Sequence, residues 1–241
     1  MLSIVIPTYN EESYLPNLLE CLEKQTFKKF EVIVADANSA DSTRAIAEKY
    51  GAKVVQGGLP AVARNIGAKV SRHNLLMFVD ADITFPNDFI EKSIKEFEKT
   101  ETDLGCAYYD NTQVDSKLIK LHFKLWNLGQ AFWQHTPFPI SSSQVMFMRQ
   151  DVFEDLNGFN EKIIISEDID IIKRTTRSDY KFKMLTTKYY PSTRRFEKHG
   201  IIRPMFSGGM GAFFVYMNIP ENPILQKSLE LVYGRWGNYK N

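Results

Sequence analysis

Leu75-Leu76-Met77-Phe78-Val79-Asp80-Ala81-Asp82 joins an apolar run to two carboxylates that are separated by one residue. Five consecutive apolar residues are typical of a strand buried on both faces of a parallel sheet, and ligands gather at the carboxyl ends of such strands. Asp80 and Asp82 therefore fall where a ligand would lie. Carboxylate oxygens suit Mg2+ or Mn2+, with substrate phosphates completing the coordination shell. The structural alternative is that both aspartates only end the strand and cap the turn before Pro86.

The chain before this stretch alternates between expected strands and expected helices. Apolar runs predict strands at residues 2–6, 30–35, 53–55 and 75–79. Helices are expected between them at residues 12–24, up to Tyr50, and from Pro60 onward. This order is typical of a doubly wound α/β half with right-handed crossovers.

After Asp82 the alternation loosens. Helices are expected at residues 87–99, 115–135 and 166 to about 176, with Ser166 as N-cap of the last one, and strands at 104–109 and 144–148. No repeat, low-complexity segment or linker separates the two halves. The second half is therefore predicted to complete a single domain.

The expected helix at 115–135 is unusually rich in large apolar side chains. They recur at spacings of three and four and comprise Leu118, Leu121, Leu125, Trp126, Leu128, Phe132 and Trp133. The preferred interpretation is a stripe that faces the core, and contact of Trp133 with an acceptor substrate is the alternative.

Composition narrows the class of protein. The 241 residues carry 44% hydrophobic and 24% charged residues, which is typical of a folded soluble protein. The net charge of +1 argues against a general nucleic-acid binder. Cys21 and Cys106 are too few for a disulfide framework or a zinc site, which predicts reduced thiols in a cytoplasmic protein.

The two ends of the chain lack the pattern of a targeting or membrane-spanning segment. The N-terminus has no basic start followed by a long apolar stretch, so no signal peptide is expected. The late apolar run at 210–219 is interrupted and too short to cross a bilayer. A cytoplasmic location is therefore expected, with peripheral contact at the inner face of the membrane left open.

Polar clusters follow three of the expected strands, at residues 8–11, 36–41 and 80–82. In an open α/β sheet all three can line one crevice at the strand ends. The sequence has no Gly-x-Gly-x-x-Gly after the first strand and no Gly-x-x-x-x-Gly-Lys-Ser/Thr. Dinucleotide-binding dehydrogenases and P-loop enzymes are therefore disfavoured, and a metal and basic side chains are expected to bind phosphates.

Several motifs, taken in order, resemble those of family 2 inverting glycosyltransferases. They are Ile4 to Glu12, Val34 to Thr43, Ala63-Arg64-Asn65-Ile66-Gly67, Asp80-Ala81-Asp82, the segment Gln144 to Glu161, and Glu167-Asp168. The resemblance runs over roughly residues 2–178. It implies a GT-A fold, here a single doubly wound mixed sheet with helices on both faces, together with a nucleotide-diphosphate sugar donor and a divalent metal.

The resemblance also implies contacts with the donor. Pro7, Tyr9 and Glu11 match the first donor-binding loop, and Asp36 matches the residue that contacts the nucleobase or ribose. Arg64 matches a ribose or diphosphate contact, and its alternative is a solvated position on a helix.

Metal and base positions follow in the same way. Asp80 matches the ribose side of the metal motif and Asp82 its direct ligand, while Asp168 holds the place of the catalytic base with Glu167 beside it. Transfer requires a base because an acceptor hydroxyl must lose its proton as it attacks the anomeric carbon. The alternative for Glu167, Asp168 and Asp170 is that acids at this position only favour a helix N-terminus electrostatically.

A basic segment follows the expected base. It places Arg194, Arg195, Lys198 and His199 within a few residues and loosely resembles segments that close over the donor diphosphate. We expect Arg194, Arg195 or Lys198 to contact diphosphate and consider His199 as a metal ligand; a solvated basic turn is the alternative.

The sequence thus predicts an inverting, Mg2+- or Mn2+-dependent glycosyltransferase that uses a UDP- or GDP-sugar and a glycan or lipid-linked acceptor. Residues 1–200 are assigned to the catalytic domain and 201–241 to a helical extension that packs on this domain, on a dimer partner or on a membrane surface. A sugar-1-phosphate nucleotidyltransferase is the first alternative, although it needs a glycine-rich N-terminal phosphate loop that residues 7–12 lack. A catalytically silent sugar-nucleotide binding module is the second.

Overall fold

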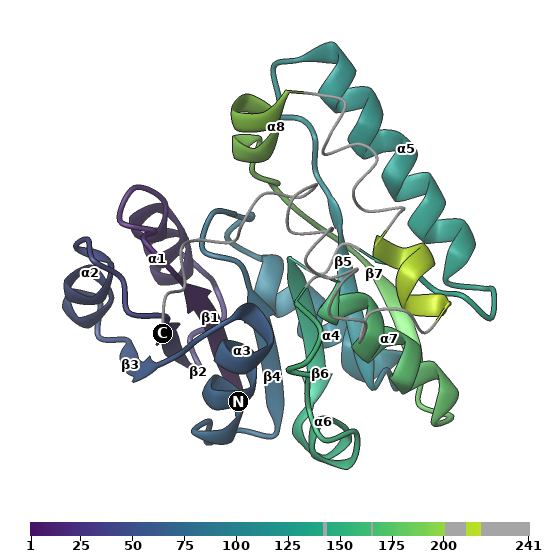
Figure 1. Cartoon of the computed structure of the whole chain (residues 1–241), viewed down its shortest axis with the longest axis horizontal. Coiled ribbons are helices and arrows are strands. Elements are labelled where there is room, and N and C mark those ends of the chain that lie inside the picture. The colour runs from purple at the N-terminus through teal and green to yellow at the C-terminus, as the bar shows by residue number, and fades with distance from the viewer. Residues whose placement is uncertain (142–143, 165, 201–210, 218–241) are drawn as a thin grey trace.

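A computed structural model describes residues 1–141, 144–164, 166–200 and 211–217. Within these ranges, seven strands form one mixed sheet (Figure 1). The strands, in their order across the sheet, are β3 (Lys53–Gln56), β2 (Phe30–Asp36), β1 (Leu2–Thr8), β4 (Leu75–Val79), β6 (Val145–Arg149), β5 (Leu104–Tyr109) and β7 (Phe182–Tyr189). The prediction of a single mixed α/β sheet is confirmed.

Helices connect the strands and cover both faces of the sheet. They are α1 (Leu15–Glu23), α2 (Thr43–Lys49), α3 (Pro60–Lys69), α4 (Phe89–Lys99), α5 (Lys117–Trp133), α6 (Gln150–Asp155), α7 (Glu167–Arg177) and α8 (Arg194–His199), with a further turn of helix at 211–216. One core cluster packs α1 and α4 on the sheet, and a second cluster packs α3, α6 and α7 on the other face. The strands between them are apolar on both sides, as doubly covered strands must be.

The first four strands are parallel, which brings their carboxyl ends to one edge. Thr8 lies opposite Asp36 in the register of β1 and β2, and β1 also pairs in parallel with β4. β6 runs antiparallel to β4, so that its first residue, Val145, lies opposite Val79. The loops after β1, β2 and β4 therefore meet at one rim, together with the entry into β6.

Helix α3 lies unusually close to β1. A side chain at Gly67 would collide with Val5 of that strand, so the small residue permits this close approach. The helix thereby holds Arg64, one turn earlier, over the rim of the sheet.

The predicted orientation of α5 was wrong. The leucines expected in the core face outward, whereas the buried side chains of this helix are Ile119, Phe123 and Gln130. The inward face also carries Asn127, whose side-chain amide donates to the Tyr109 carbonyl and whose carbonyl accepts from the Tyr109 backbone N–H. Polar side chains thus pair the backbone at the end of β5, and the apolar stripe is left on the outside.

Two features escaped the prediction from sequence. Strand β7 and helices α6 and α8 were not expected, because none of these segments has a clear apolar periodicity. Ser166 lies at the predicted N-cap position of α7, but its side chain makes no capping hydrogen bond. Its backbone is in the left-handed conformation, with φ +69°. Of the residues that the structure describes, none forms a helix long and apolar enough to cross a bilayer.

Candidate active site

Asp80 follows β4 directly, at the rim where the parallel strands end. Its backbone N–H donates to the carbonyl of Gln144 (3.0 Å), which ties the end of β4 to the entry of β6. Its carboxylate pairs with the guanidinium of Arg64, with 3.0 Å between Nη2 and Oδ1. Burial raises the pKa of the Asp80 carboxyl, Arg64 opposes that rise, and the neighbouring Asp82 adds to it.

Arg64 joins two distant parts of the chain. Its guanidinium binds Asp80 on one side and Glu167, at the first position of α7, on the other. The residue is 6% exposed, and its guanidinium lies 5.5 Å from the centre of the Phe159 ring. We call Asp80, Arg64 and Glu167 the buried clamp.

The buried clamp brings the predicted base next to the predicted metal motif. Burial raises the pKa of Glu167, and the positive charge of Arg64 counteracts that rise. Asp168 follows Glu167 in the first turn of α7, and its negative charge acts on both Arg64 and Asp80. Glu167 is thus held in an ion pair, while Asp168 lies beside it at the same helix end.

Asn65, next to Arg64, connects two of the predicted motifs, residues 63–67 and the segment Gln144 to Glu161, through hydrogen bonds. Its side chain donates to the carbonyl of Phe159 (2.9 Å) and to Glu161 (2.8 Å), and accepts from the Phe159 N–H (2.8 Å). Gly158 has φ +66°, and an added Cβ would lie 2.6 Å from the Asn65 side-chain oxygen. The segment before α7 is therefore anchored on α3, which fixes the distance between Arg64 and Glu167.

Asp82 belongs to a second ionic group, in which Arg194 forms ion pairs with both Asp82 and Glu11. We call these two ion pairs of Arg194 together the outer pair. The Arg194 guanidinium lies 2.7 Å from Glu11 Oε2 and 3.2 Å from Asp82 Oδ2. It also stacks 4.7 Å from the centre of the Tyr14 ring. Burial raises the pKa of Glu11, Arg194 lowers it, and the charges of Asp82 and Asp80 raise it further.

Asp36 organises the loops after β1 and β2. Its side chain is fully buried and accepts hydrogen bonds from Thr8 Oγ1 (3.0 Å) and from the N–H (3.0 Å) and hydroxyl (2.5 Å) of Ser39. Arg44 lies 3.4 Å from the same carboxylate. Asp36 therefore holds the shape of this loop, and its predicted contact with a nucleobase or ribose stays a prediction.

The other predicted residues lie around this rim. Pro7 and Tyr9 are half-buried at the end of β1. Arg195 is exposed, and its positive charge offsets a small part of the rise that burial causes in the pKa of Asp80. Lys198 is exposed on α8, and the side chain of His199 lies outside the part of the chain that the structure describes.

A cavity of about 210 Å3 adjoins Asp82. Its lining includes Tyr14, Asp110, Tyr190 and Thr193, the last of which precedes α8. Tyr14 was not predicted from the sequence, although its position three residues after Glu11 was a signal. Cavities that bind small molecules usually exceed about 300 Å3, so this one is small for a whole ligand of that kind.

The rim offers a donor set for a divalent cation. Across the described ranges, no group of three or more His, Cys, Asp or Glu side chains is arranged to hold a metal. Asp80 and Asp82 nevertheless supply two hard oxygen ligands one residue apart, and Mg2+ or Mn2+ is often bound by one or two carboxylates with phosphate oxygens completing the shell. Guanidinium groups face both carboxylates, so a divalent cation bound to Asp82 would compete with Arg194 for its carboxylate.

The chain matches a protein family and known relatives. The family model described as "Glycosyl transferase family 2" matches residues 3–156. Glycosyltransferase AglE of Haloferax volcanii is 27% identical over 189 residues, which are 74% of this chain and 62% of AglE. The chain thus spans less than two thirds of this relative.

Solved structures show the same fold. The mannosyltransferase PcManGT from Pyrobaculum calidifontis, in complex with GDP-Man and Mn2+, superposes with a TM-score of 0.71 at 17% identity, covering 95% of this chain and 69% of PcManGT. TarS 1-349 from S. aureus, in complex with UDP-GlcNAc, gives 0.63 at 22% identity, covering 99% and 72%. The predicted GT-A fold is confirmed.

Proposed function

The chain belongs to glycosyl transferase family 2, and from this membership we propose that it is an inverting, metal-dependent glycosyltransferase. It moves a sugar from a nucleotide-diphosphate donor to an acceptor hydroxyl. The observation that carries this proposal is the convergence of the buried clamp and the outer pair on the two aspartates after β4. The donors named in the complexes of PcManGT and TarS support a UDP- or GDP-sugar here.

Asp82 is the proposed direct ligand of Mg2+ or Mn2+, with Asp80 as its partner on the ribose side. When bound, the ion supplies positive charge that stabilises the departing nucleoside diphosphate. Arg194 already faces Asp82 and Glu11, so its guanidinium is close enough to contact the same diphosphate. Arg195 and Lys198 are proposed to add to this positive charge.

Asp168 is the proposed base. It accepts the proton of the acceptor hydroxyl while that oxygen attacks the anomeric carbon from the face opposite the leaving group, which inverts the anomeric configuration. Glu167 was the other candidate, but its ion pair with Arg64 makes it the anchor that holds the start of α7. Through this ion pair, the main proposed role of Arg64 is to position the base relative to the metal motif. Direct contact with the donor is not its main proposed role.

Pro7, Tyr9 and Glu11 are proposed to form the donor-binding loop, with Asp36 holding its shape or contacting the nucleobase. The hydrogen bonds from Asn10 N–H to Ser39 (2.8 Å) and from Glu11 N–H to Thr43 (2.8 Å) keep this loop against the loop after β2. Such a preformed loop lowers the entropic cost of binding a donor.

Product analysis tests the proposal. The protein is incubated with UDP- and GDP-sugars and Mn2+, with and without glycan or lipid-linked acceptors, after a thermal-shift screen selects the donors that stabilise it. We expect release of nucleoside diphosphate that increases with acceptor and metal, and a product of inverted anomeric configuration by NMR. Release of pyrophosphate would identify a nucleotidyltransferase, and metal-dependent binding without turnover would identify a binding module.

A further inference from the structure

The outer face of α5 carries an apolar stripe of exposed side chains. Its side chains are 47–65% exposed and comprise Leu118, Leu121, Leu125, Leu128 and Phe132. At 1.5 Å per residue, the stripe from Leu118 to Phe132 extends over about 21 Å. Isolated exposed leucines are common, but a continuous row of this length marks a surface that meets another apolar phase.

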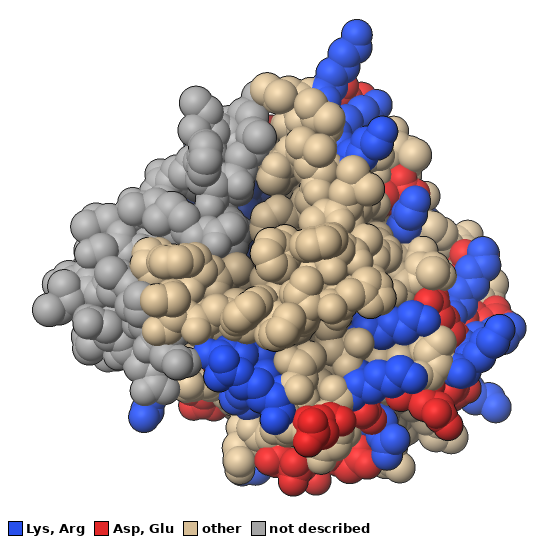
Figure 2. All heavy atoms as spheres, turned by 90° about the vertical axis from the view of Figure 1, so that its right-hand side faces the viewer, with Lys and Arg blue, Asp and Glu red and all other residues tan. Residues whose placement is uncertain are grey.

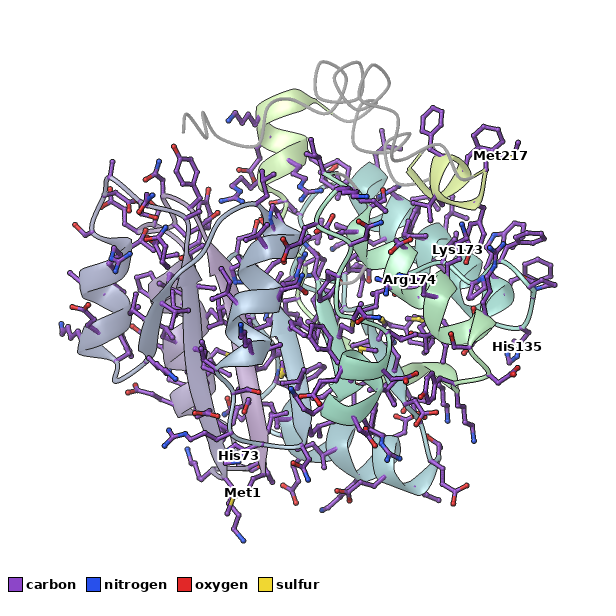
Figure 3. All side chains as sticks on the ribbon, turned by 60° about the horizontal axis from the view of Figure 1, so that its bottom comes forward. Met1, His73, His135, Lys173, Arg174 and Met217 are labelled. Atoms are coloured by element: carbon purple, nitrogen blue, oxygen red, sulfur yellow. The ribbon has the colours of Figure 1, made fainter. Side chains whose placement is uncertain are left out.

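The apolar surface continues beyond the helix. Trp133 and Phe138 are 39% and 48% exposed, and Phe213 and Met217 of the late helical turn are 59% and 57% exposed. The two segments are held together, because the ring of Phe138 lies 5.3 Å from that of Tyr216, whose hydroxyl donates to the Pro139 carbonyl (2.6 Å). Figure 3 shows His135 and Met217 at the same end of the molecule, close to α7. We call this surface the α5 face.

The charged side chains of helix α5 itself have one sign. Helix α5 carries Lys117, Lys120 and Lys124, and no Asp or Glu occurs between Asp115 and Asp151. Figure 2, which looks onto the side where α5 lies in Figure 1, shows a broad uncharged expanse with Lys and Arg side chains along much of its border, together with some Asp and Glu. An apolar face rimmed by lysines and rich in Leu, Phe and Trp is typical of a helix that lies in a membrane interface.

A second copy of the chain fits this surface less well. The leucines recur at spacings of three and four, as in a coiled-coil seam, but the positions that flank the stripe are Lys117, His122 and Lys124. An antiparallel pair of α5 helices would bring these lysines together, and in neither direction of packing does α5 offer them an acidic partner. Anionic phospholipid headgroups provide the opposite charge, together with an apolar phase.

We propose that the α5 face docks on an anionic phospholipid membrane, with the leucine and aromatic side chains in the interface and the lysines on the headgroups. Docking lies outside the proposed catalytic steps. The α5 face also adjoins the candidate active site, because Phe123 of α5 packs against Phe196 of α8, the helix that carries Arg194.

Vesicle cosedimentation of the full chain tests the proposal. We expect binding to phosphatidylcholine vesicles that contain about one quarter phosphatidylglycerol, weak binding to pure phosphatidylcholine, and release at about 0.5 M salt. Replacement of two exposed leucines by L121Q and L125Q should lower the affinity by about tenfold or more while leaving the melting temperature unchanged.

Two matched triple variants isolate the charge contribution. K117Q with K120Q and K124Q removes three lysines from α5, and K92Q with K95Q and K99Q removes three from the exposed side of α4. The first should weaken binding by about fivefold per lysine, and the second should leave it within about twofold.

Several results would overturn the proposal. These are absence of binding to anionic vesicles, unchanged binding of the leucine variant, or equal losses in the two lysine variants. The wild type could instead form a dimer in sedimentation velocity that the L121Q and L125Q replacements dissociate, and could fail to bind vesicles. That result would assign the α5 face to contact with a second copy of the chain. D82N should bind vesicles as the wild type does, so failure of this proposal is distinguishable from failure of the proposed function.

Discussion

Arg64 and Arg194 each contact two carboxylates beside the same strand end, yet their environments differ. The Arg64 side chain is 7% exposed, on a helix packed closely against β1, whereas the Arg194 side chain is 29% exposed on the six-residue helix α8. A buried guanidinium that pairs with the buried Glu167 and the half-buried Asp80 cannot leave without exposing unpaired charge in a poorly solvated site. The buried clamp is therefore part of the fold, and the outer pair is the exchangeable part, where donor phosphates and a metal can take over the charges.

Replacing Arg64 should produce the largest effect on stability. Arg64→Met leaves the buried Glu167 and the half-buried Asp80 without their cation, and we expect the free energy of unfolding to fall by about 3–5 kcal/mol. Arg194→Met is the matched control and should cost at most about 1 kcal/mol, because the Arg194 side chain itself is partly accessible to solvent, which weakens its ion pairs. Urea unfolding measures both, and equal losses would contradict the distinction between the clamp and the outer pair.

Replacing Asp82 should act on metal-dependent donor binding. Asp82→Asn removes the proposed direct ligand, so Mn2+ should no longer raise donor affinity, which corresponds to a loss of about tenfold or more. Asp110→Asn changes a carboxylate that lines the same cavity and should keep the metal response. Calorimetric titration of the donor with and without Mn2+ makes the comparison, and a metal-sensitive Asp82→Asn would move the ligand elsewhere.

The outer pair also predicts a small pH dependence of stability. Because burial raises the pKa of Glu11 above 4.5, the folded protein holds this proton to higher pH than the unfolded chain does. Its contribution to the free energy of unfolding is therefore full below pH 4.5 and is lost as the pH rises through the folded pKa. Glu11→Gln should flatten this decline in urea unfolding over about pH 4 to 7, and an unchanged slope would show that other acids cause it.

The sequence predicted the parts of the site that depend on local pattern. The strands at 2–6, 30–35, 75–79 and 104–109 are apolar runs with clear ends, so their positions and the rim they create could be predicted. The aspartates after β4 and the acids that open α7 could be predicted for the same reason. Their assignments as metal ligands and base stay predictions.

Contacts between distant residues could not be predicted in this way. Arg64 and Glu167 are 103 residues apart, and nothing in their local pattern indicates that they form an ion pair. The predicted orientation of α5 was wrong. The number and spacing of its apolar residues favoured a buried leucine stripe, whereas the backbone N–H and carbonyl of Tyr109 required Asn127 on the inner face. Hydrogen-bonding requirements set by tertiary structure can thus override periodicity. The assignment of 201–241 as an extension stays a prediction, and 201–210 and 218–241 lie outside the described residues.

The most direct test of the account compares Asp168→Asn with Asp170→Asn. Both remove a negative charge from the first turn of α7, but Asp168 is the proposed base and Asp170 pairs with Arg174 at 2.7 Å. The measurement is single-turnover sugar transfer together with donor affinity. The account predicts that Asp168→Asn binds donor within about twofold of the wild type and loses about 10²- to 10⁴-fold in transfer rate, while Asp170→Asn keeps transfer. Transfer retained by Asp168→Asn, or lost equally in both variants, would contradict the assignment of the base.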